Sequence, residues 1–490
     1  MSIQVHRTNT ILSPDQSRVL LRAFTHGDSQ RASGIIARVL ALSEETVNLL
    51  MEELSADFCQ RHQDIHERYC GRFEQMREQV PGAAELSEQR RELIGAYFLA
   101  EYSLESAALF NPSIVPHPDQ SDLPPGAVRF VLSLRATGEG HISSITFRTG
   151  IIHRDHRIEI TVPTGFLTEP RQIPNSVYEK PLFGRKLAEL GLGGDFVEQV
   201  LQELGDTFTM EHLQMSVETA KSLSPDATVA QDNAVGRSIW MLARSNYEVR
   251  FPENQPLCTR IIFPSTPSQS NGIEDARFVR FQEDDGSATY YATFTAYDGT
   301  VVMPELVSTS DFLHFRFNTL NGTSAVNKGM ALFPRKIGGL YAMLGRQDNE
   351  NIHLMLSDNI HFWNESRLLL KPAFPWEGVQ VGNCGSPIET DAGWLVLSHG
   401  VGPMRKYCIG AFLLDLEDPS KVIGRLREPL LKPNRKEREG YVPNVVYTCG
   451  AIVHNEQLVI PYGLADHATG FATTPLAELL TTLLREGNAS

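Results

Sequence analysis

Groups of short β-strands recur along most of this 490-residue chain, and they limit the folds that it can adopt. Polar and apolar side chains alternate with a period of two, and glycine and proline turns separate the strands. The groups recur at roughly 50 to 60 residues, and they span 111–162, 237–300, 301–360, 376–425 and 440–475. This spacing predicts a β-propeller of about five blades. A two-sheet sandwich is the main alternative, because no strict sequence repeat is present.

Two helical regions interrupt this β pattern. Residues 14 to about 108 carry apolar residues at helical spacing, and Ser43 with the acids after it has the pattern of a helix start. Helices are further expected at 64–80, 87–110, 187–204 and 210–222. We therefore expect a mainly β protein, a five-bladed β-propeller at 109–490 with a helical N-terminal domain at 1–108 and a helical insertion at about 165–236.

The composition excludes several classes of function. The net charge is −15, and a nucleic-acid-binding protein would need a basic face, so we expect no nucleic-acid partner. The sequence has no run of apolar residues long enough for a membrane span, and its first residues lack the apolar core of a secretory signal. We therefore expect a cytoplasmic protein without membrane contact. The six cysteines are scattered and form no CxxC pair, so we expect reduced thiols and no metal site.

The motif at 271–278 is the strongest candidate for chemistry. It places Glu274 and Asp275 side by side, close to Arg277. Adjacent residues of a strand point to opposite faces, so we expect the two carboxylates to have different roles. A carboxylate held near an arginine at a strand end suits glycoside chemistry, whereas a charged turn with a local ion pair is the simpler interpretation.

Several groups of residues, in order along the chain, resemble motifs of glycoside hydrolase family 130, the mannoside phosphorylases and β-mannosidases. They are Asn111-Pro112 with Arg135; Gly272-Ile273-Glu274-Asp275-Ala276-Arg277; Lys328 with Phe333-Pro334-Arg335-Lys336 and Arg346; Pro387-Ile388 with Gly393-Trp394-Leu395 and His399-Gly400; and Glu437 with Tyr441-Val442-Pro443-Asn444 and Asp466. Ala276 stands where the family often has proline. The two helical regions lie outside the usual core of the family.

The resemblance implies a five-bladed propeller and a role for each matched side chain. Asp275 is expected to be the catalytic acid, acting through a sugar hydroxyl, which requires a carboxyl that is protonated when substrate binds. Cationic side chains suit phosphate oxygens, although a salt bridge between blades is the simpler role for any one of them. The expected phosphate-binding residues are Arg135, Arg277, Lys328, Lys336, Arg346 and His399. The expected substrate-binding residues are Asn111, Glu274, Tyr407 and Asp466.

We expect an enzyme, a glycoside phosphorylase that cleaves β-mannosides with inversion and releases mannose 1-phosphate. No cofactor is expected. The expected co-substrate is inorganic phosphate, and the expected substrate is an oligosaccharide. Trp376 or Tyr441 could stack on a sugar face. One alternative is a β-mannosidase that hydrolyses β-1,2-linked mannosides, with Glu437 or Glu439 as the base. Another is a non-catalytic sugar-binding propeller, and a homo-oligomer is compatible with each of these.

Overall fold

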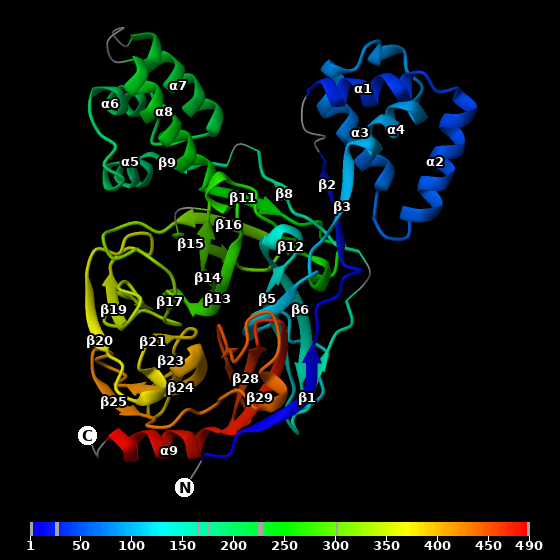
Figure 1. Ribbon diagram of the computed structural model, residues 1–490. Coiled ribbons are helices and arrows are strands. Elements are labelled where there is room, and N and C mark those ends of the chain that lie inside the picture. The colour runs from blue at the N-terminus through cyan, green and yellow to red at the C-terminus, as the bar shows by residue number, and fades with distance from the viewer. Residues whose placement is uncertain are drawn as a thin grey trace.

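The chain is mainly β, as predicted. The computed structural model describes residues 3–24, 29–163, 166–174, 176–223, 229–299 and 302–487. Within these ranges, most strands belong to five larger antiparallel sheets of four to six strands each (Figure 1). We number these sheets 1 to 5 in chain order.

The sheets are built mostly from strands that are close in sequence. Sheet 1 has the order β12–β6–β5–β4 with β7 beside β6, and contains β4 (Ala108–Pro116), β5 (Val128–Thr137), β6 (Ser143–Ile152), β7 (Ile158–Ile160) and β12 (Ile261–Ile262). Sheet 2 has the order β13–β14–β15–β16–β11–β8, and contains β8 (Arg171–Gln172), β11 (Tyr247–Arg250), β13 (Ile273–Gln282), β14 (Ala288–Tyr297), β15 (Val302–Thr309) and β16 (His314–Thr319).

The other three sheets come from the C-terminal half. Sheet 3 has the order β17 (Ala331–Leu332), β18 (Tyr341–Gly345), β19 (Ile352–Ser357), β20 (Ser366–Leu370). Sheet 4 has the order β21 (Gln380–Asn383), β23 (Gly393–Gly402), β24 (Lys406–Leu414), β25 (Val422–Arg425), with β22 (Ile388–Thr390) beside β23. Sheet 5 has the order β1 (His6–Leu12), β29 (Ala468–Pro475), β28 (Gln457–Leu464), β26 (Val446–Tyr447), with β27 (Ile452–His454) beside β28. Helix α9 (Leu476–Gly487) follows and packs on β25.

The predicted strand groups agree only approximately with these sheets, because β12 of the second group joins sheet 1 and β20 lies beyond the predicted end at 360. The hairpin of β5 and β6 forms as expected, with a tight turn between Thr137 and Ser143. The boundary placed near residue 300 is wrong, because β15 and β16 continue sheet 2 beyond β14. A glycine turn inside a sheet has the same local pattern as a turn between two sheets, so spacing alone cannot distinguish them.

Four helices form one apolar cluster near the N-terminus. They are α1 (Ser29–Leu40), α2 (Glu44–Phe58), α3 (Ile65–Met76) and α4 (Glu88–Tyr97). The predicted helix start at Ser43 is confirmed, because the Ser43 side chain accepts a hydrogen bond from the Thr46 amide. The predicted helix 87–110 is too long, since α4 ends at Tyr97. The next residues form β3 (Leu99–Ser103) and β4, and a strand buried on both faces resembles a buried helix in sequence.

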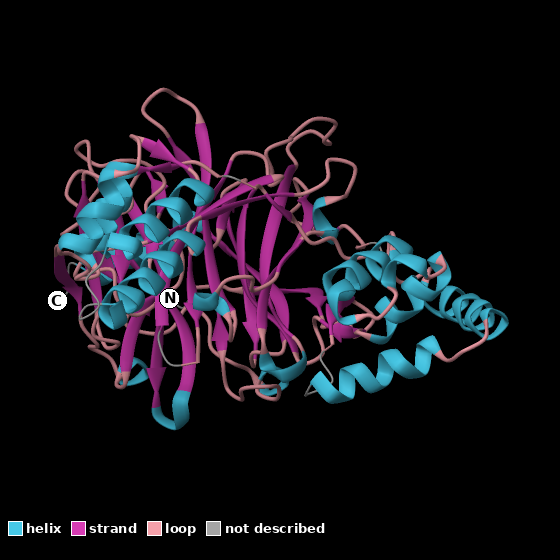
Figure 2. Ribbon diagram, turned by 90° about the horizontal axis from the view of Figure 1, so that it is seen from above, coloured by secondary structure: helices cyan, strands magenta, loops and turns pink. Residues whose placement is uncertain are grey.

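Four further helices form the insertion, and Figures 1 and 2 show them apart from α1–α4. They are α5 (Lys180–Glu189), α6 (Asp195–Gln202), α7 (Met210–Leu223) and α8 (Val229–Arg244), with a small pair of strands, β9 (Tyr178–Glu179) and β10 (Thr207–Phe208). The β pattern was expected to resume at residue 237, but α8 continues to Arg244. Within the described residues, no helix combines the length and apolar character needed to cross a membrane.

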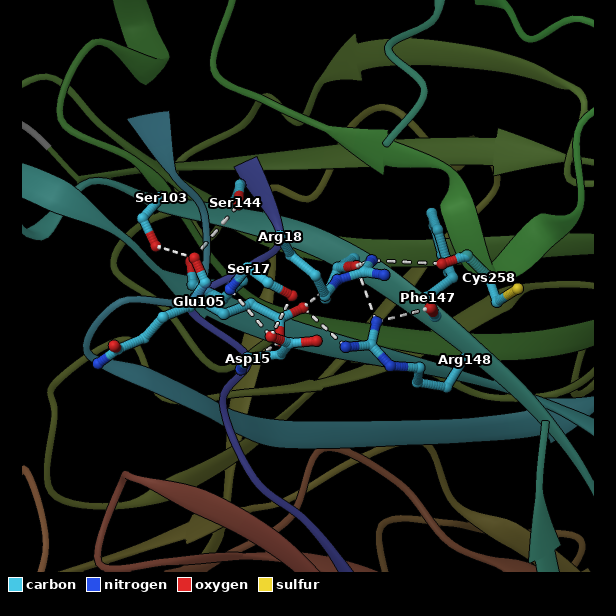
Figure 3. Close-up of polar contacts among 12 residues, drawn as sticks. Asp15, Ser17, Arg18, Ser103, Glu105, Ser144, Phe147, Arg148 and Cys258 are labelled. Carbon is cyan, nitrogen blue, oxygen red and sulfur yellow. Dashed lines mark hydrogen bonds and ion pairs between the residues drawn. The ribbon is translucent and has the colours of Figure 1, made fainter. Parts of the chain in front are cut away.

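A buried ionic cluster joins the N-terminal segment to sheet 1 (Figure 3). Strand β2 (Val19–Ala23) pairs with β3 and connects the sheets to α1–α4. Just before β2, Arg18 donates from Nε to Glu105, and Arg148 of β6 donates to the same carboxylate oxygen, at 2.8 and 2.7 Å. Arg18 also donates to the carbonyl of Cys258. Burial, followed by repulsion from Arg148, lowers the pKa of Arg18 to about 10.

Candidate active site

A cavity of about 420 Å³ receives side chains from all five sheets or from the loops at their ends. Sheet 1 contributes Asn111 and Arg135, sheet 2 Glu274 and Asp275, sheet 3 Lys328 and Arg346, sheet 4 His399 and Tyr407, and sheet 5 Tyr447 and Asp466. These residues are far apart in sequence, and most of them are charged or polar. Thirteen site residues were predicted, counting the two alternative hydrolase bases. Nine of the thirteen line this one cavity.

Strand irregularities aim the key polar side chains into this cavity. The pairing of β4 is interrupted between Phe110 and Ser113, and that of β13 between Glu274 and Arg277. At the two interruptions, Asn111 and Asp275 have positive φ angles of 49° and 55°. The expectation that Glu274 and Asp275 point to opposite faces is wrong, because the bulge breaks the alternation and both side chains line the cavity.

Arg135 holds the two neighbouring carboxylates. Its Nη2 donates to Glu274 at 2.7 Å, and its Nη1 lies 3.5 Å from Asp275 Oδ1. Asn111 donates from Nδ2 to the same Oδ1 of Asp275 at 2.5 Å. Ser143 orients the arginine by accepting from its Nε. Side chains of sheet 1 therefore fix the position of the predicted acid on sheet 2.

The carboxyl groups of the cavity differ in their protonation. Burial acts to raise the pKa of Asp275, but Arg135, Arg277 and Lys328 outweigh it and lower that pKa below its ordinary value. Burial and the charge of Asp275 raise the pKa of Asp466 to about 7. Without substrate, the cationic neighbours therefore favour the ionised form of Asp275. The expectation that this carboxyl is protonated when substrate binds stays a prediction.

Two cations, Lys328 and Arg346, border the cavity together with the imidazole of His399, and we call these three side chains the cationic wall. Arg346 Nη1 is 3.1 Å from His399 Nε2. Burial, together with the charges of Arg346, Arg277 and Lys328, lowers the pKa of His399 well below its ordinary value, so the ring is neutral and Nε2 can accept from Arg346. The His399 ring stacks against Tyr407. Lys328 also lines the cavity, and it lies close enough to influence both Asp275 and His399.

Arg277 lies behind this wall and is engaged by the protein. It is buried and donates to the Cys384 carbonyl at 2.5 Å, to the Tyr447 hydroxyl at 2.7 Å and to the Met330 carbonyl at 3.4 Å. These bonds connect sheets 2, 3, 4 and 5 or the loops at their ends. Arg277 therefore supports the cavity from behind while its charge still acts on Asp275.

Three other predicted residues do not line the cavity. Lys336 pairs with Asp284 at 2.6 Å in a solvent-exposed position. Glu437 accepts from Arg7 and from the Tyr462 hydroxyl, and Glu439 is exposed. None of the three is among the residues that border the cavity in the described part of the chain.

The sequence analysis missed several residues of the cavity. Asn349, Gln380, Arg405 and Tyr447 line it. Arg405 has a φ of 53°, and it follows Met404, which also has a positive φ, in a short turn after Gly402. A turn with Pro403 is visible in the sequence, but the direction of its arginine is not. Tyr441 also lines the cavity, which is consistent with its predicted contact with sugar.

Comparisons with known proteins identify the family. The family model described as beta-1,4-mannooligosaccharide phosphorylase, that of glycoside hydrolase family 130, matches residues 238–485, just over half of the chain. The chain belongs to glycoside hydrolase family 130. This match confirms the resemblance seen in the motifs.

Curated relatives include enzymes that act on β-mannosides. A 1,2-beta-oligomannan phosphorylase of Thermoanaerobacter sp. is 43% identical over 155 residues, 31% of this chain and 52% of the relative. A beta-1,2-mannobiose phosphorylase of Listeria innocua is 34% identical over 227 residues, 45% of this chain and 62% of the relative. The chain therefore spans between half and two thirds of the length of these relatives. The solved structure of beta-1,2-mannobiose phosphorylase from Listeria innocua with beta-1,2-mannobiose is 22% identical, with a TM-score of 0.46, over 78% of this chain and 93% of that one.

Proposed function

We propose that this protein is a glycoside phosphorylase that cleaves β-mannosides with inversion and releases mannose 1-phosphate. The observation that carries the proposal is the cavity, which the carboxylate of Asp275 borders together with Arg346, Lys328 and His399. A carboxyl group and a cationic wall around one space suit a sugar whose leaving oxygen takes a proton while a phosphate attacks the other face. Membership of a family that contains mannoside phosphorylases supports this interpretation.

The five larger sheets suit the blades of a five-bladed propeller. A second cavity of about 460 Å³ is bordered by Val115, Phe278, Pro334, Pro387 and Ile452, again from the same five sheets or adjoining loops. Two cavities that each receive residues from every sheet are expected if the sheets surround one axis. We therefore propose a propeller domain at 109–490, to which β1 adds a strand of sheet 5. The rest of the helical domain at 1–108 and the insertion predicted at about 165–236, whose last helix continues to Arg244, are additions to it.

The proposed reaction joins proton transfer to phosphate attack. A phosphate oxygen attacks the anomeric carbon of the mannosyl group while the glycosidic C–O bond breaks. The leaving oxygen takes a proton from a sugar hydroxyl, which is replenished by Asp275. In the unliganded protein, nearby cations keep Asp275 ionised. A bound phosphate dianion neutralises those cations, so it raises the pKa of Asp275 and prepares the acid only when the co-substrate is present.

The remaining cavity residues are proposed to hold the sugar and the phosphate. Arg346 and Lys328 would bind phosphate, with Arg135 at its edge and Arg277 as support. His399, which was expected to bind phosphate directly, would orient Arg346 for it by accepting a hydrogen bond at Nε2. We leave Lys336 out of the phosphate site, because its amine is engaged by Asp284 in a solvent-exposed position. The mannosyl hydroxyls would bind Asn111, Glu274, Tyr407 and Asp466, which line the same space. A homo-oligomer stays a prediction.

The hydrolase alternative requires a base that activates water. Glu437 is held by Arg7 and Tyr462, and Glu439 is exposed, so neither of the two expected bases lines the cavity. This argues against the hydrolase with Glu437 or Glu439 as its base, since a hydrolase needs its second carboxylate near the anomeric carbon. We assign the other two carboxyl groups of the cavity, Glu274 and Asp466, to the sugar hydroxyls.

Product analysis on two disaccharides tests the proposal. β-1,2-Mannobiose and β-1,4-mannobiose are incubated with the protein, with and without inorganic phosphate, and mannose and mannose 1-phosphate are resolved. We expect mannose 1-phosphate only when phosphate is present. Free mannose at the same rate without phosphate would identify a hydrolase, and binding without turnover of either sugar would favour a non-catalytic sugar-binding protein.

A further inference from the structure

A further polar cavity, different from the two described above, lies between the helical insertion and sheet 2, and we call it the insertion cavity. Its volume is about 360 Å³. The insertion contributes Lys186 of α5, sheet 2 contributes Arg316 of β16, and the loop after β19 contributes His361. Helix α5 docks on the same loop, because the guanidinium of Arg185 lies 3.7 Å from the centre of the Phe362 ring. The cavity is distinct from the candidate active site, with which it shares no lining residue.

Lys186 is a buried ammonium group with unused donors. Lys186 is only 2% exposed, and its Nζ donates to Asn246 Oδ1 at 2.6 Å. This is the single hydrogen bond of that amine among the described residues, although an ammonium group can donate three. A buried cation is costly unless an anion or further acceptors compensate it.

The protein provides only a weak counter-charge for this lysine. Glu305 is the carboxyl group that acts on Lys186, and it is fully buried with hydrogen bonds from Ser268 and Gln269. Burial raises the pKa of Glu305 to about 7 and lowers that of Lys186 to about 7. Near neutral pH, both groups are therefore only partly charged. An anion bound beside Lys186 would stabilise its ammonium form more than the partly ionised Glu305 does.

Two other nitrogen groups face the same cavity. The Nδ1 atom of His361 is buried and has no hydrogen-bond partner in the described part of the chain. Burial, and then the charges of Lys186 and Arg316, lower the pKa of His361 to about 3, which places all three groups within electrostatic reach of one another. Arg316 donates from Nε to Glu248, and in the described part of the chain its terminal nitrogens have no hydrogen-bond acceptor.

The carboxylates at the cavity do not cancel this set of donors. Glu248 is held by Arg316 and His314, at 3.0 and 2.7 Å. Glu179 lies at the exposed edge. The remaining wall includes the hydroxyl and amide groups of Ser308 and Asn318, which can bond sugar hydroxyls. The cavity is near the lower end of the volumes typical of small-molecule sites, which are about 300 to 1,000 Å³.

We propose that the insertion cavity is a second anion site, which binds a phosphate group, either as inorganic phosphate or on a sugar, through Lys186, Arg316 and His361. A phosphate oxygen accepts from all three groups, and its charge compensates the buried ammonium. This site does not depend on the activity proposed for the other cavity. It gives the insertion a binding role in addition to its packing against sheet 2.

Phosphate stoichiometry tests the proposal. Equilibrium dialysis of the full chain against inorganic phosphate is expected to give two sites per chain. Lys186→Met should remove one of them, and Arg316→Gln should weaken the same one by about tenfold or more. Arg346→Ala should remove the other. The exposed Lys421, which pairs with Asp418, provides the control, and Lys421→Met should retain both sites.

The outcomes separate this site from the proposed activity. If the cavity of the candidate active site binds no phosphate, the wild type has one site. Lys186→Met then removes this site and Arg346→Ala retains it. Circular dichroism checks that the helices persist in Lys186→Met, and the exposed Arg316 allows a substitution with little risk to folding. Wild-type stoichiometry and affinity in both Lys186→Met and Arg316→Gln would overturn the proposal.

A second ligand distinguishes the two sources of phosphate. In Arg346→Ala, glucose 1-phosphate and inorganic phosphate are compared at the site that remains. Tighter binding of the sugar phosphate by about tenfold supports a site for a phosphorylated sugar. Equal or weaker binding supports a site for inorganic phosphate, and absence of binding by both ligands contradicts the site.

Discussion

At the scale of single residues, backbone conformation and chemistry select the same side chains. Asn111, Asp275 and Asp466 all line the cavity of the candidate active site, and all have positive φ angles between 49° and 55°. Asparagine and aspartate tolerate this region better than other residues with a Cβ atom. Their short polar side chains therefore suit both the strained turn and the sugar, and such strain is typical of functional sites.

The role of Asp275 as acid can be separated from its role in the backbone. Asp275→Asn keeps the size of the side chain and its tolerance of positive φ, but it cannot deliver the proton. We expect kcat to fall by about 100-fold or more, whereas the free energy of unfolding changes less than in Asp275→Ala, which adds about 1 kcal/mol of backbone strain. Kinetics with mannobiose and urea unfolding measure the two effects. Full activity in Asp275→Asn would remove this residue from the mechanism.

The pKa of Asp466 predicts a pH dependence of stability. In the folded protein this pKa is raised to about 7, from its ordinary value of 3.8. The folded state therefore binds more protons between these values, so the free energy of unfolding falls as pH rises through the window. In Asp466→Asn this part of the fall should be absent. Urea unfolding of both proteins at pH 5 and pH 8 measures the difference.

Glu305 provides an internal reference for that comparison. Its pKa is raised in the same direction and stays so in both proteins. The difference between wild type and Asp466→Asn therefore reports Asp466 alone. An identical loss of stability between pH 5 and pH 8 in the two proteins would contradict the assignment.

At the scale of elements, the β5–β6 hairpin connects the N-terminal helices to the mouth of the cavity. Tyr102 of β3 donates to the carbonyls of Glu139 and Ile142 in the hairpin turn. In the same turn, His141 Nδ1 lies 2.8 Å from the hydroxyl of Tyr441, which lines the cavity. The hairpin therefore positions a residue expected to contact the sugar.

Removal of this contact should affect the disaccharide more than the phosphate. In Tyr441→Ala we expect KM for mannobiose to rise by about 3- to 10-fold, because an aromatic contact contributes roughly 0.5–1.5 kcal/mol. KM for phosphate should stay unchanged, since the cationic wall is intact. Tyr441→Phe keeps the ring and should have a smaller effect. Equal rises in both KM values would indicate a general disturbance of the cavity instead.

At the scale of the whole molecule, local patterns predict elements better than their partners. The strand groups and the Asp275 motif are visible in sequence, and Arg346 and His399 line the cavity as expected. Lys336 does not, because it lies in the loop between β17 and β18 and pairs there with Asp284, a distant partner that no local pattern indicates. The pairing of β1 with β29 has no local signal, since it joins His6 to Thr473. The bulge at Asp275 likewise depends on how β13 meets β14.

The buried cluster at Arg18 should control the stability of the whole chain. Glu105→Gln leaves Arg18 and Arg148 buried without their shared counter-charge, so we expect the free energy of unfolding to fall by about 3–5 kcal/mol. Asp119→Asn is the matched control, because Asp119 pairs with Arg129 in a solvent-exposed position and its loss should cost far less than that of Glu105. Urea unfolding measures both. A similar small loss in the two variants would mean that solvent or another group compensates the arginines, and the cluster would then contribute little to joining the N-terminal segment to sheet 1.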